Sequence, residues 1–360
     1  MVSGGHYADS TGGIVIANEN PLDVSGEVRL YEAMRRFWHP VAYASDLQTG
    51  PLKATLLGEE IVLVRLGGGV QAFRDLCVHR GTPLSLGWVE GDRLRCAYHG
   101  WTYGSDGVCV EIPARHGPVI PKRARLQRYL AEEHGGLIWV CLQPEPVFSI
   151  PELPEWEHPE YTVVQVPGYD WACGAARRVE NFVDFAHIAW VHDGSLGDRN
   201  RPEVPEHEVR REGGELRWEA TLIEPANEKL DPSLVDGPVY SDNRWRLFMP
   251  FTVWFHQTMP GDKRWMVYIA TSPIHRTSCR TFTFMARNYD RDEDPDKYIR
   301  FQLEIAEQDR VVTESQKPEE LPVDLSAELH IRGVDAISLE YRKWLVELME
   351  ERSSLADSPT

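Results

Sequence analysis

The sequence has few of the features that mark secreted, membrane or nucleic-acid-binding proteins. It holds six cysteines in 360 residues, too few for a disulfide scaffold. No apolar run approaches the roughly 18 residues that a membrane-spanning helix needs, and the opening MVSGGHYADS lacks the basic and apolar segments of a secretory signal. Acidic residues outnumber basic ones by 56 to 38, which argues against nucleic acid or anionic lipid as a partner. We therefore expect a cytoplasmic protein that binds neither nucleic acid nor membrane.

The pattern of apolar and turn-forming residues changes along the chain and predicts an α+β protein. Short apolar runs joined by glycine-rich turns, such as 61–66 with 70–74, indicate a small all-β domain in the first half. The second half mixes strand-like runs, including 244–255, with helical patterns over 177–191, 295–316 and 337–350, and indicates an antiparallel sheet with helices. The divisions that we predict are an N-terminal arm and short helix (1–35), the all-β domain (36–148), a proline-rich linker (149–164) and the α+β domain (165–360).

Two short segments each combine one cysteine with one histidine. They read Cys77-x-His79 and, sixteen residues later, Cys96-x-x-His99. Two thiolates and two imidazoles suit a structural zinc site. In zinc fingers, however, one short segment usually carries both cysteines and the other carries both histidines. A two-iron, two-sulfur cluster with two cysteines on one iron and two histidines on the other needs both types from both loops, which is the Rieske arrangement. The motif therefore favours such a cluster, with backbone N–H groups and Tyr98 as candidate hydrogen-bond donors to sulfur.

A second group of histidines lies in the apolar run over 180–192. His187 and His192 are five residues apart, about 140° out of register on a straight helix, so joint binding of one metal predicts that the helix ends or bulges between them. Histidine pairs in apolar helices are more often structural. Asp184, one turn before His187, favours a metal site because an aspartate in an apolar run needs a partner such as a histidine N–H.

A non-haem iron(II) site of the facial-triad type needs a carboxylate beside two histidines. The helix expected from Pro295 offers Asp309, which falls on the apolar stripe formed by Phe301, Ile305 and Val312. An aspartate on a solvated face would lie off this stripe. Periodicity alone leaves Asp309 equally open to a structural role.

Taken together, these motifs resemble those of the Rieske non-haem iron oxygenases, in the catalytic (alpha) subunit. The resemblance rests on the two Cys-His segments, on Asn181-x-x-Asp184-x-x-His187-x4-His192, and on Glu307-Gln308-Asp309 followed by Ser315-Gln316. The chain's length is similar to that of the branch with dicamba and vanillate O-demethylases. The stretches 192–200 and 341–345 look similar to oxygenases of that branch that hydroxylate saxitoxin-type alkaloids.

The resemblance implies a fold, cofactors and an assembly. The fold would be an all-β Rieske domain plus an antiparallel-sheet, helix-grip catalytic domain. Electrons from NAD(P)H would pass through a separate flavin reductase or ferredoxin to a [2Fe-2S] cluster on Cys77, His79, Cys96 and His99. They would then reach a mononuclear Fe(II), held by His187, His192 and Asp309, that activates O2.

In the family this transfer crosses between subunits of a ring of three, and the position of Asp184 bridges a cluster histidine of one subunit, here His99, to an iron ligand of the next, here His187. We therefore expect a homotrimer, with Asp184 and Asn181 as catalytic residues.

The expected function is hydroxylation or oxidative demethylation of a small aromatic or alkaloid-like substrate. The alternative is a Rieske electron carrier whose C-terminal domain only binds a ligand. Segment 77–130 holds eight basic and four acidic residues in an acidic chain, which suggests a docking face for an acidic ferredoxin-like partner. Candidates for the lining of the substrate pocket, each equally open to a role in the core, are Phe182, Phe185, Trp254, Phe255 and His256.

Overall fold

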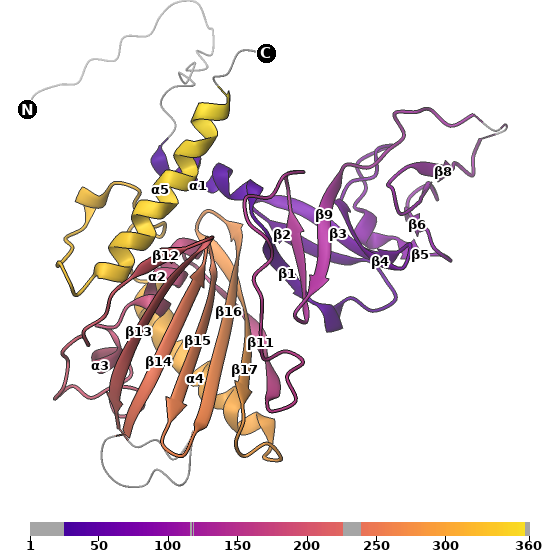
Figure 1. Ribbon diagram of the computed structural model, residues 1–360. Helices are drawn as coiled ribbons and strands as arrows, with labels where there is room; N and C mark the ends of the chain where they lie inside the picture. The colour runs from indigo at the N-terminus through magenta and orange to yellow at the C-terminus, as the bar shows by residue number, and fades with distance from the viewer. Residues whose placement is uncertain (1–24, 116, 118, 226–238, 357–360) are drawn as a thin grey trace, which may run out of the picture.

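The computed structural model describes residues 25–115, 117, 119–225 and 239–356, with side chains to 350. Two β-rich parts lie side by side, and the first of them extends away from the second (Figure 1). The greater part of the predicted N-terminal arm lies outside the described residues. Among the described helices, none is long and apolar enough to cross a membrane.

The first part contains two antiparallel sheets. The larger has the strand order β1-β10-β9-β4-β3-β2, and the smaller β5-β6-β7-β8. The hairpin predicted over 61–74 is confirmed, because β3 and β4 pair in register across the glycine turn. The strands are β1 (His39–Tyr43), β2 (Leu52–Leu56), β3 (Glu59–Leu66), β4 (Gly69–Arg74), β5 (Trp88–Val89), β6 (Leu94–Arg95), β7 (Thr102–Tyr103), β8 (Cys109–Glu111), β9 (Arg128–His134) and β10 (Leu137–Cys141).

The second part is built on one seven-stranded antiparallel sheet with the order β11-β17-β16-β15-β14-β13-β12. The strands are β11 (Thr162–Trp171), β12 (Arg210–Glu212), β13 (Glu215–Glu224), β14 (Val239–Phe248), β15 (Thr252–Met259), β16 (Lys263–His275) and β17 (Ser278–Arg287). The single strand predicted over 244–255 is wrong. The chain turns at 249–251, and β14 pairs back on β15 from Phe248 opposite Thr252.

Helices cover one face of this sheet and its upper end (Figure 1). Asp294 caps α4 by accepting a hydrogen bond from the Asp296 N–H, and Pro295 occupies the first turn, where no N–H is needed. The helices are α1 (Gly26–Ala33), α2 (Ala175–Val183), α3 (Ile188–Val191), α4 (Pro295–Thr313) and α5 (Ala336–Ala356), with 3₁₀ turns at Met34–Arg36, Ala44–Asp46, Leu84–Leu86 and Leu325–Ala327.

The continuous helix predicted over 177–191 is also wrong. Helix α2 ends at Val183, and Asp184 adopts an extended conformation with φ −76° and ψ 128°. The Asp184 carboxylate then accepts hydrogen bonds from the N–H groups of Ala186 and His187, as an N-cap does, and a second short helix follows. His187 and His192 are the two caps of α3, which runs unbroken between them, so the break expected between the two histidines lies instead before His187.

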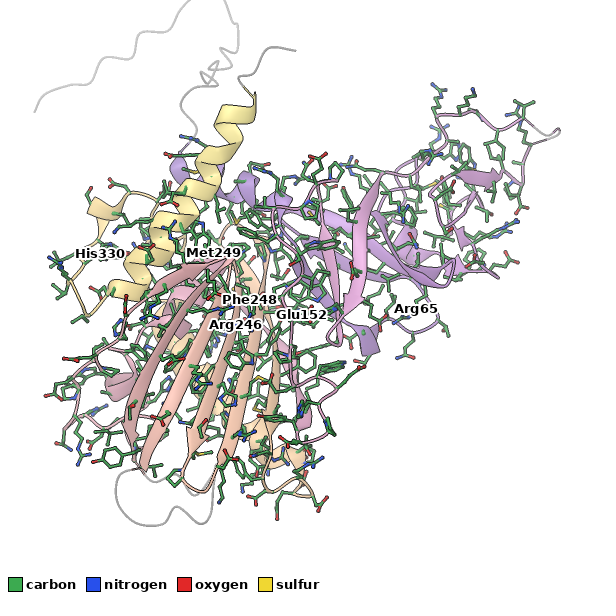
Figure 2. All side chains as sticks on the ribbon, in the orientation of Figure 1. Arg65, Glu152, Arg246, Phe248, Met249 and His330 are labelled. Atoms are coloured by element: carbon green, nitrogen blue, oxygen red, sulfur yellow. The ribbon has the colours of Figure 1, made fainter. Side chains whose placement is uncertain are left out.

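A shared core joins the two parts. Buried side chains of α1, β1 and β3 pack in one cluster with residues of α2, α5 and the seven-stranded sheet. Met249, labelled in Figure 2, belongs to this cluster at the end of the sheet where β14 turns into β15. The fold therefore places α2, α3 and α4 against one face of a rigid sheet.

Candidate metal centres and cavity

The two Cys-His segments lie in turns that follow β4 and β6. Cys77 and Cys96 are buried, and their side chains are close enough to interact. The imidazole rings of His79 and His99 lie 4.6 Å apart between centroids. Two loops thus present one sulfur and one imidazole each to a common point.

This donor set fits a cluster with sulfur on one iron and nitrogen on the other. The Nδ1 atom of His79 is buried and has no hydrogen-bond partner in the described chain, so its lone pair is left for a ligand bond. The His79 ring stacks on Trp101, with centroids 4.7 Å apart, which holds its orientation. Backbone N–H groups of Tyr98 and His99 hydrogen-bond to the Cys96 sulfur, as the sequence suggested.

The side chain expected to donate to sulfur is Tyr103 rather than Tyr98. Tyr98 is 64% exposed, whereas the Tyr103 hydroxyl is buried 3.1 Å from the Cys77 sulfur, where it can donate a hydrogen bond to a thiolate. Tyr103 lies on β7, and only the pairing of β6 with β7 brings it under the first loop. No local sequence signal identifies this contact.

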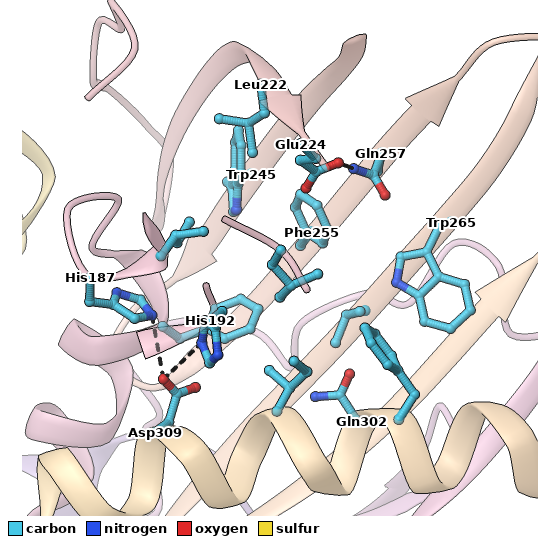
Figure 3. A pocket seen from close by; sticks show the side chains of 16 residues that line it. His187, His192, Leu222, Glu224, Trp245, Phe255, Gln257, Trp265, Gln302 and Asp309 are labelled. Atoms are coloured by element: carbon cyan, nitrogen blue, oxygen red, sulfur yellow. Dashed lines mark hydrogen bonds and ion pairs between the residues drawn. The ribbon is translucent and has the colours of Figure 1, made fainter. Parts of the chain in front are cut away.

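The second site joins α3 to α4. The Nε2 atoms of His187 and His192 lie 3.4 and 3.0 Å from one oxygen, Oδ1 of Asp309 (Figure 3). Within the described residues this is the one group of three metal-binding side chains whose ligand atoms all lie within 4.8 Å of one another. Two imidazoles and one carboxylate are the donor set of a facial triad.

Each histidine is held through its other ring nitrogen. Asp184 contacts Nδ1 of His187 at 3.3 Å, and Oε1 of Gln308 accepts from Nδ1 of His192 at 2.7 Å. Both hydrogen bonds place a ring proton on Nδ1, so Nε2 is the nitrogen that faces Asp309 and can bind a metal. Gln308 was expected only as part of a motif, and its contact with His192 is a role that the sequence alone did not assign.

Asn181 and Arg178 lie behind the carboxylate. Asn181 Nδ2 donates to Oδ1 of Asp309 at 3.3 Å, and its own oxygen accepts from the buried Arg178 guanidinium at 3.1 Å. Arg178 also donates to the Tyr169 hydroxyl and lies over the Trp171 ring. Asn181 therefore contacts Asp309 from behind, and Arg178 is a neighbour of the site that the sequence did not indicate.

The electrostatics of this group suit a cation. Burial opposes charge on Asp309, but its contacts with His187 and His192 hold the pKa of the carboxyl well below its usual range. Burial lowers the pKa of His187, yet the flanking carboxylates of Asp184 and Asp309 raise it to about 9. A proton is thus favoured where two acids surround one imidazole, and a divalent cation can replace that proton.

A cavity opens beside the three side chains, between α3, α4 and the sheet (Figure 3). Most of its described wall is apolar, including Trp245, Phe301 and Ile305. Of the five residues predicted to line it, Phe182 and Phe255 do so, whereas Phe185 is buried in the core against Trp245. Trp254 and His256 do not, because strand residues alternate and Phe255 takes the inner face of β15. The two stack on the other face, where Trp254 donates to Glu155.

On α4 the predicted stripe is confirmed at Phe301, Ile305 and Asp309, which are all buried. Val312 is wrong as a core residue, since it is 46% exposed. It is in phase with the stripe but lies in the last turn of the helix, beside Val311, which is 61% exposed. The apolar stripe thus continues onto the outer surface next to the metal-binding group.

The fold and these two donor sets match known protein families. Residues 37–129 match the Rieske [2Fe-2S] domain, and residues 171–351 match the vanillate O-demethylase oxygenase C-terminal domain. The chain therefore belongs to the Rieske non-haem iron oxygenases, as a catalytic alpha subunit. The electron-carrier and zinc interpretations are excluded by these matches.

Individual relatives are similar over almost the whole chain. The methylxanthine N1-demethylase NdmA of Pseudomonas putida is 35% identical over 329 residues, covering 89% of this chain and 90% of that protein. The solved structure of Pseudomonas putida CBB5 NdmA with caffeine matches with a TM-score of 0.82 at 33% identity, over 91% of this chain and 94% of that one. Dicamba monooxygenase bound to dicamba shares the fold, with a TM-score of 0.78 at 21% identity over 89% of this chain and 98% of that one.

Family membership establishes the reaction class. The protein is an oxygenase that uses a Rieske cluster, a mononuclear iron, O2 and electrons from a separate reductase system to oxidise a small aromatic or alkaloid-like substrate. Demethylation belongs to the same chemistry, because hydroxylating the carbon next to a heteroatom releases that carbon.

Proposed function

We propose that this chain is an oxidative N-demethylase of methylated N-heterocycles. The observation that carries the proposal is the meeting of His187, His192 and Asp309 at the wall of an apolar cavity. The similarity to a methylxanthine N1-demethylase over most of the chain supports an N-methyl group as the site of attack. The balanced reaction consumes O2, two electrons and two protons per methyl group and yields the N–H heterocycle, formaldehyde and water.

In this proposal the residues have distinct tasks. His187, His192 and Asp309 would hold Fe(II), which supplies a site where O2 is reduced and one oxygen atom is transferred to the methyl carbon. Asp184 and Gln308 keep the two imidazoles in the tautomer that offers Nε2. Asn181 positions Asp309 by donating to Oδ1. The apolar wall of the cavity excludes water and holds a flat ring against the metal-binding group.

Cys77, His79, Cys96 and His99 would hold the Rieske cluster. The Tyr103 hydroxyl contacts the Cys77 sulfur, and the backbone N–H groups at 98 and 99 donate to the Cys96 sulfur, so both cysteines are held in place by hydrogen bonds. The cluster would lie close to solvent, since His99 is exposed. An electron donor can therefore approach it from outside the chain.

We propose a homotrimer in which electrons cross from the cluster of one subunit to the iron of the next. Figure 1 shows the small sheet around the cysteine turns at the far end of the molecule from α3. Exposed apolar side chains surround both sites: Val78, Leu86, Trp88 and Tyr98 at the cluster, and Trp190, Val311 and Val312 at the metal-binding group. Contact between these two patches would bring the partner's His99 to Asp184, whose side chain is 28% exposed.

We also propose that a basic face of the first part docks the electron donor, in the cytoplasm. Seven of the eight basic residues of segment 77–130 are exposed, and the eighth, Arg95, is neutralised by ion pairs with Glu90 and Glu111. The exposed face therefore keeps an excess of positive charge that an acidic ferredoxin-like protein or flavin reductase would complement. The six cysteines are all unpaired, which suits a reducing compartment.

The first test is the metal content of the protein purified without oxygen. About three iron for every two acid-labile sulfides per chain is expected for a Rieske cluster with a mononuclear iron. With a reductase supplied, the protein should then release formaldehyde from an N-methylated heterocycle such as caffeine. A protein with the full iron count that oxidises no N-methyl compound would overturn the N-demethylase assignment and leave the oxygenase class standing.

The trimer has a separate test. Cys96→Ser should lack the cluster and Asp309→Asn should lack the iron, so each variant alone is inactive. Subunits of both kinds, unfolded to monomers and reassembled together, should regain part of the activity, because an intact cluster can then face an intact iron site. Mixed oligomers without activity would contradict transfer between subunits.

A further inference from the structure

A carboxyl group lies in the wall of the apolar cavity, away from the metal-binding group. Glu224 ends β13, and in Figure 3 it is seen across the cavity from Asp309. Its Oε2 atom accepts hydrogen bonds from Gln257 Nε2 at 2.6 Å and from Ser241 Oγ at 3.3 Å. Its Oε1 atom has no hydrogen-bond partner in the part of the chain that the structure describes.

Within the described wall of the cavity, no cation balances this carboxyl. The described residues that line the cavity include no lysine or arginine. Burial raises the pKa of Glu224 to about 7, and the hydrogen bonds from Gln257 and Ser241 oppose the rise. A partly buried carboxyl with one oxygen unpaired in the described chain is costly unless something in the cavity donates to it.

A second polar group lies in the wall of the cavity, on α4. The Gln302 side chain lines the cavity, is only 6% exposed and makes no hydrogen bond in the described chain. It lies on α4 seven residues before Asp309, two turns or about 10 Å along the helix axis. In the described chain, an amide on α4 and a carboxyl oxygen on β13, both without a hydrogen-bond partner, therefore face the same cavity as the metal-binding group.

We propose that Glu224 is a specificity-determining residue that accepts an N–H from a nitrogen heterocycle and rejects aromatic carboxylates. Gln302 completes the recognition by hydrogen-bonding a neighbouring ring carbonyl or ring nitrogen. The preferred substrate is thus a partly methylated heterocycle, with an N–CH3 edge toward Asp309 and an N–H edge toward Glu224. The inference rests on the proposed function in that it uses the same cavity.

Glu224→Gln separates recognition from a purely structural role. The Gln257 N–H group needs an acceptor, so the amide oxygen of the new side chain turns to it and the NH2 group faces the cavity. The strands stay joined, but the group offered to the ligand changes from an acceptor to a donor. Glu219→Gln is the matched control, because Glu219 lies on the same strand and is exposed outside the cavity.

The experiment measures binding to the oxidised holoenzyme by calorimetry with no reductant, so that nothing turns over. Theobromine carries a ring N–H where caffeine is methylated, and vanillate carries a carboxylate. The wild-type protein should bind theobromine at least about tenfold more tightly than caffeine or vanillate. Glu224→Gln should abolish the preference over caffeine and strengthen vanillate binding at least about tenfold, while Glu219→Gln should match the wild type.

Every outcome of this binding experiment either supports or overturns the proposed role of Glu224. A Glu224→Gln protein with unchanged ratios among the three probes would overturn the proposal, and so would a wild-type protein that binds vanillate as well as theobromine or binds neither. The expected binding pattern without any oxidation of theobromine would support the subsite and contradict the N-demethylase function. If theobromine is oxidised but Glu224→Gln has no effect on binding, the N-demethylase function is supported and the subsite is contradicted.

Discussion

The Nε2 atom of His192 lies 3.0 Å from Oδ1 of Asp309, while the residue before Asp309 holds the other nitrogen of the same ring. Gln308 and Asp309 are neighbours on α4, so one stretch of helix sets both the tautomer of His192 and the charge that faces it. Moving α4 relative to α3 would break both contacts together. The packing of α4 on the sheet is therefore part of the metal site.

Asp309→Asn should remove the mononuclear iron and leave the cluster. The neutral amide loses the negative charge that the two histidines share, so the count should fall from about three to about two iron per two sulfides. The visible spectrum of the cluster should not change. Glu307→Gln, an exposed change on the same helix, is the control and should keep all three irons.

Gln308→Leu should weaken iron binding without altering any ligand. Loss of the 2.7 Å contact frees the His192 ring to rotate and to take the other tautomer, and such losses lower metal affinity about 10- to 100-fold. Titration of the metal-free protein with ferrous iron measures the change. Gln308→Glu keeps an acceptor and should bind near the wild-type level; equal weakening in both variants would contradict a role through the hydrogen bond.

Asp184→Asn should uncouple the two sites. Ala186 and His187 donate to different oxygens of Asp184, and the single amide oxygen can keep one of these two hydrogen bonds, so the turn and the iron should remain. Loss of the charge that we propose to bridge to the partner's His99 should slow electron transfer to the iron at least about tenfold. Rapid-mixing spectroscopy separates this step from reduction of the cluster by its reductase, which should keep its rate. Normal transfer to the iron would rule out the bridge.

Glu224 should destabilise the protein as pH rises. Its folded pKa of about 7 exceeds the ordinary value of 4.5, so the folded state holds the proton more tightly, and the cost of charging it appears between these values and is complete above pH 7. The cost is at most about 3 kcal/mol. Glu224→Gln should therefore raise the Tm of the second part by a few degrees at pH 8 and leave it unchanged at pH 4.5. Glu219→Gln should have no such pH-dependent effect.

Reversing two exposed charges should impair delivery of electrons. Arg123→Glu with Arg125→Glu removes positive charge near the cluster without touching a buried residue. The rate of cluster reduction by an acidic ferredoxin should fall severalfold at low salt, and the difference should shrink as salt screens the surfaces. Reduction by dithionite, which needs no docking, is the control. Unchanged rates at low salt would place the docking face elsewhere.

Much of both sites could be predicted from local patterns. Each Cys-His pair lies within one turn, and the periodicity of α4 placed Asp309 among buried residues before any contact was known. The break after Val183 was missed although its signal was present: an aspartate three residues before His187 is also a helix N-cap. If Asp184 is interpreted only as a buried acid, the sequence predicts one continuous helix.

Contacts between strands could not be predicted in the same way. Whether Trp254 or Phe255 faces the cavity depends on how β15 pairs with its neighbouring strands. A slip of one residue in that pairing would move every side chain of the strand to the other face of the sheet. The turn at 249–251 sets that register, but the sequence pattern predicted a single strand across this turn. For the same reason, the sequence did not predict the contact of Tyr103 with Cys77 or that of Glu224 with Gln257.

The sequence by itself determined the chemistry: which side chains can bind iron, which loops carry them and which family they belong to. These depend on residue types at short spacings, where the geometry of a turn or a helix decides what is near what. Only the tertiary structure decided which carboxylate meets His187 and His192, which nitrogen each ring offers and which polar groups face the substrate. Those relations join residues from distant strands and helices, and packing of α4 on the sheet, not local conformation, brings them together.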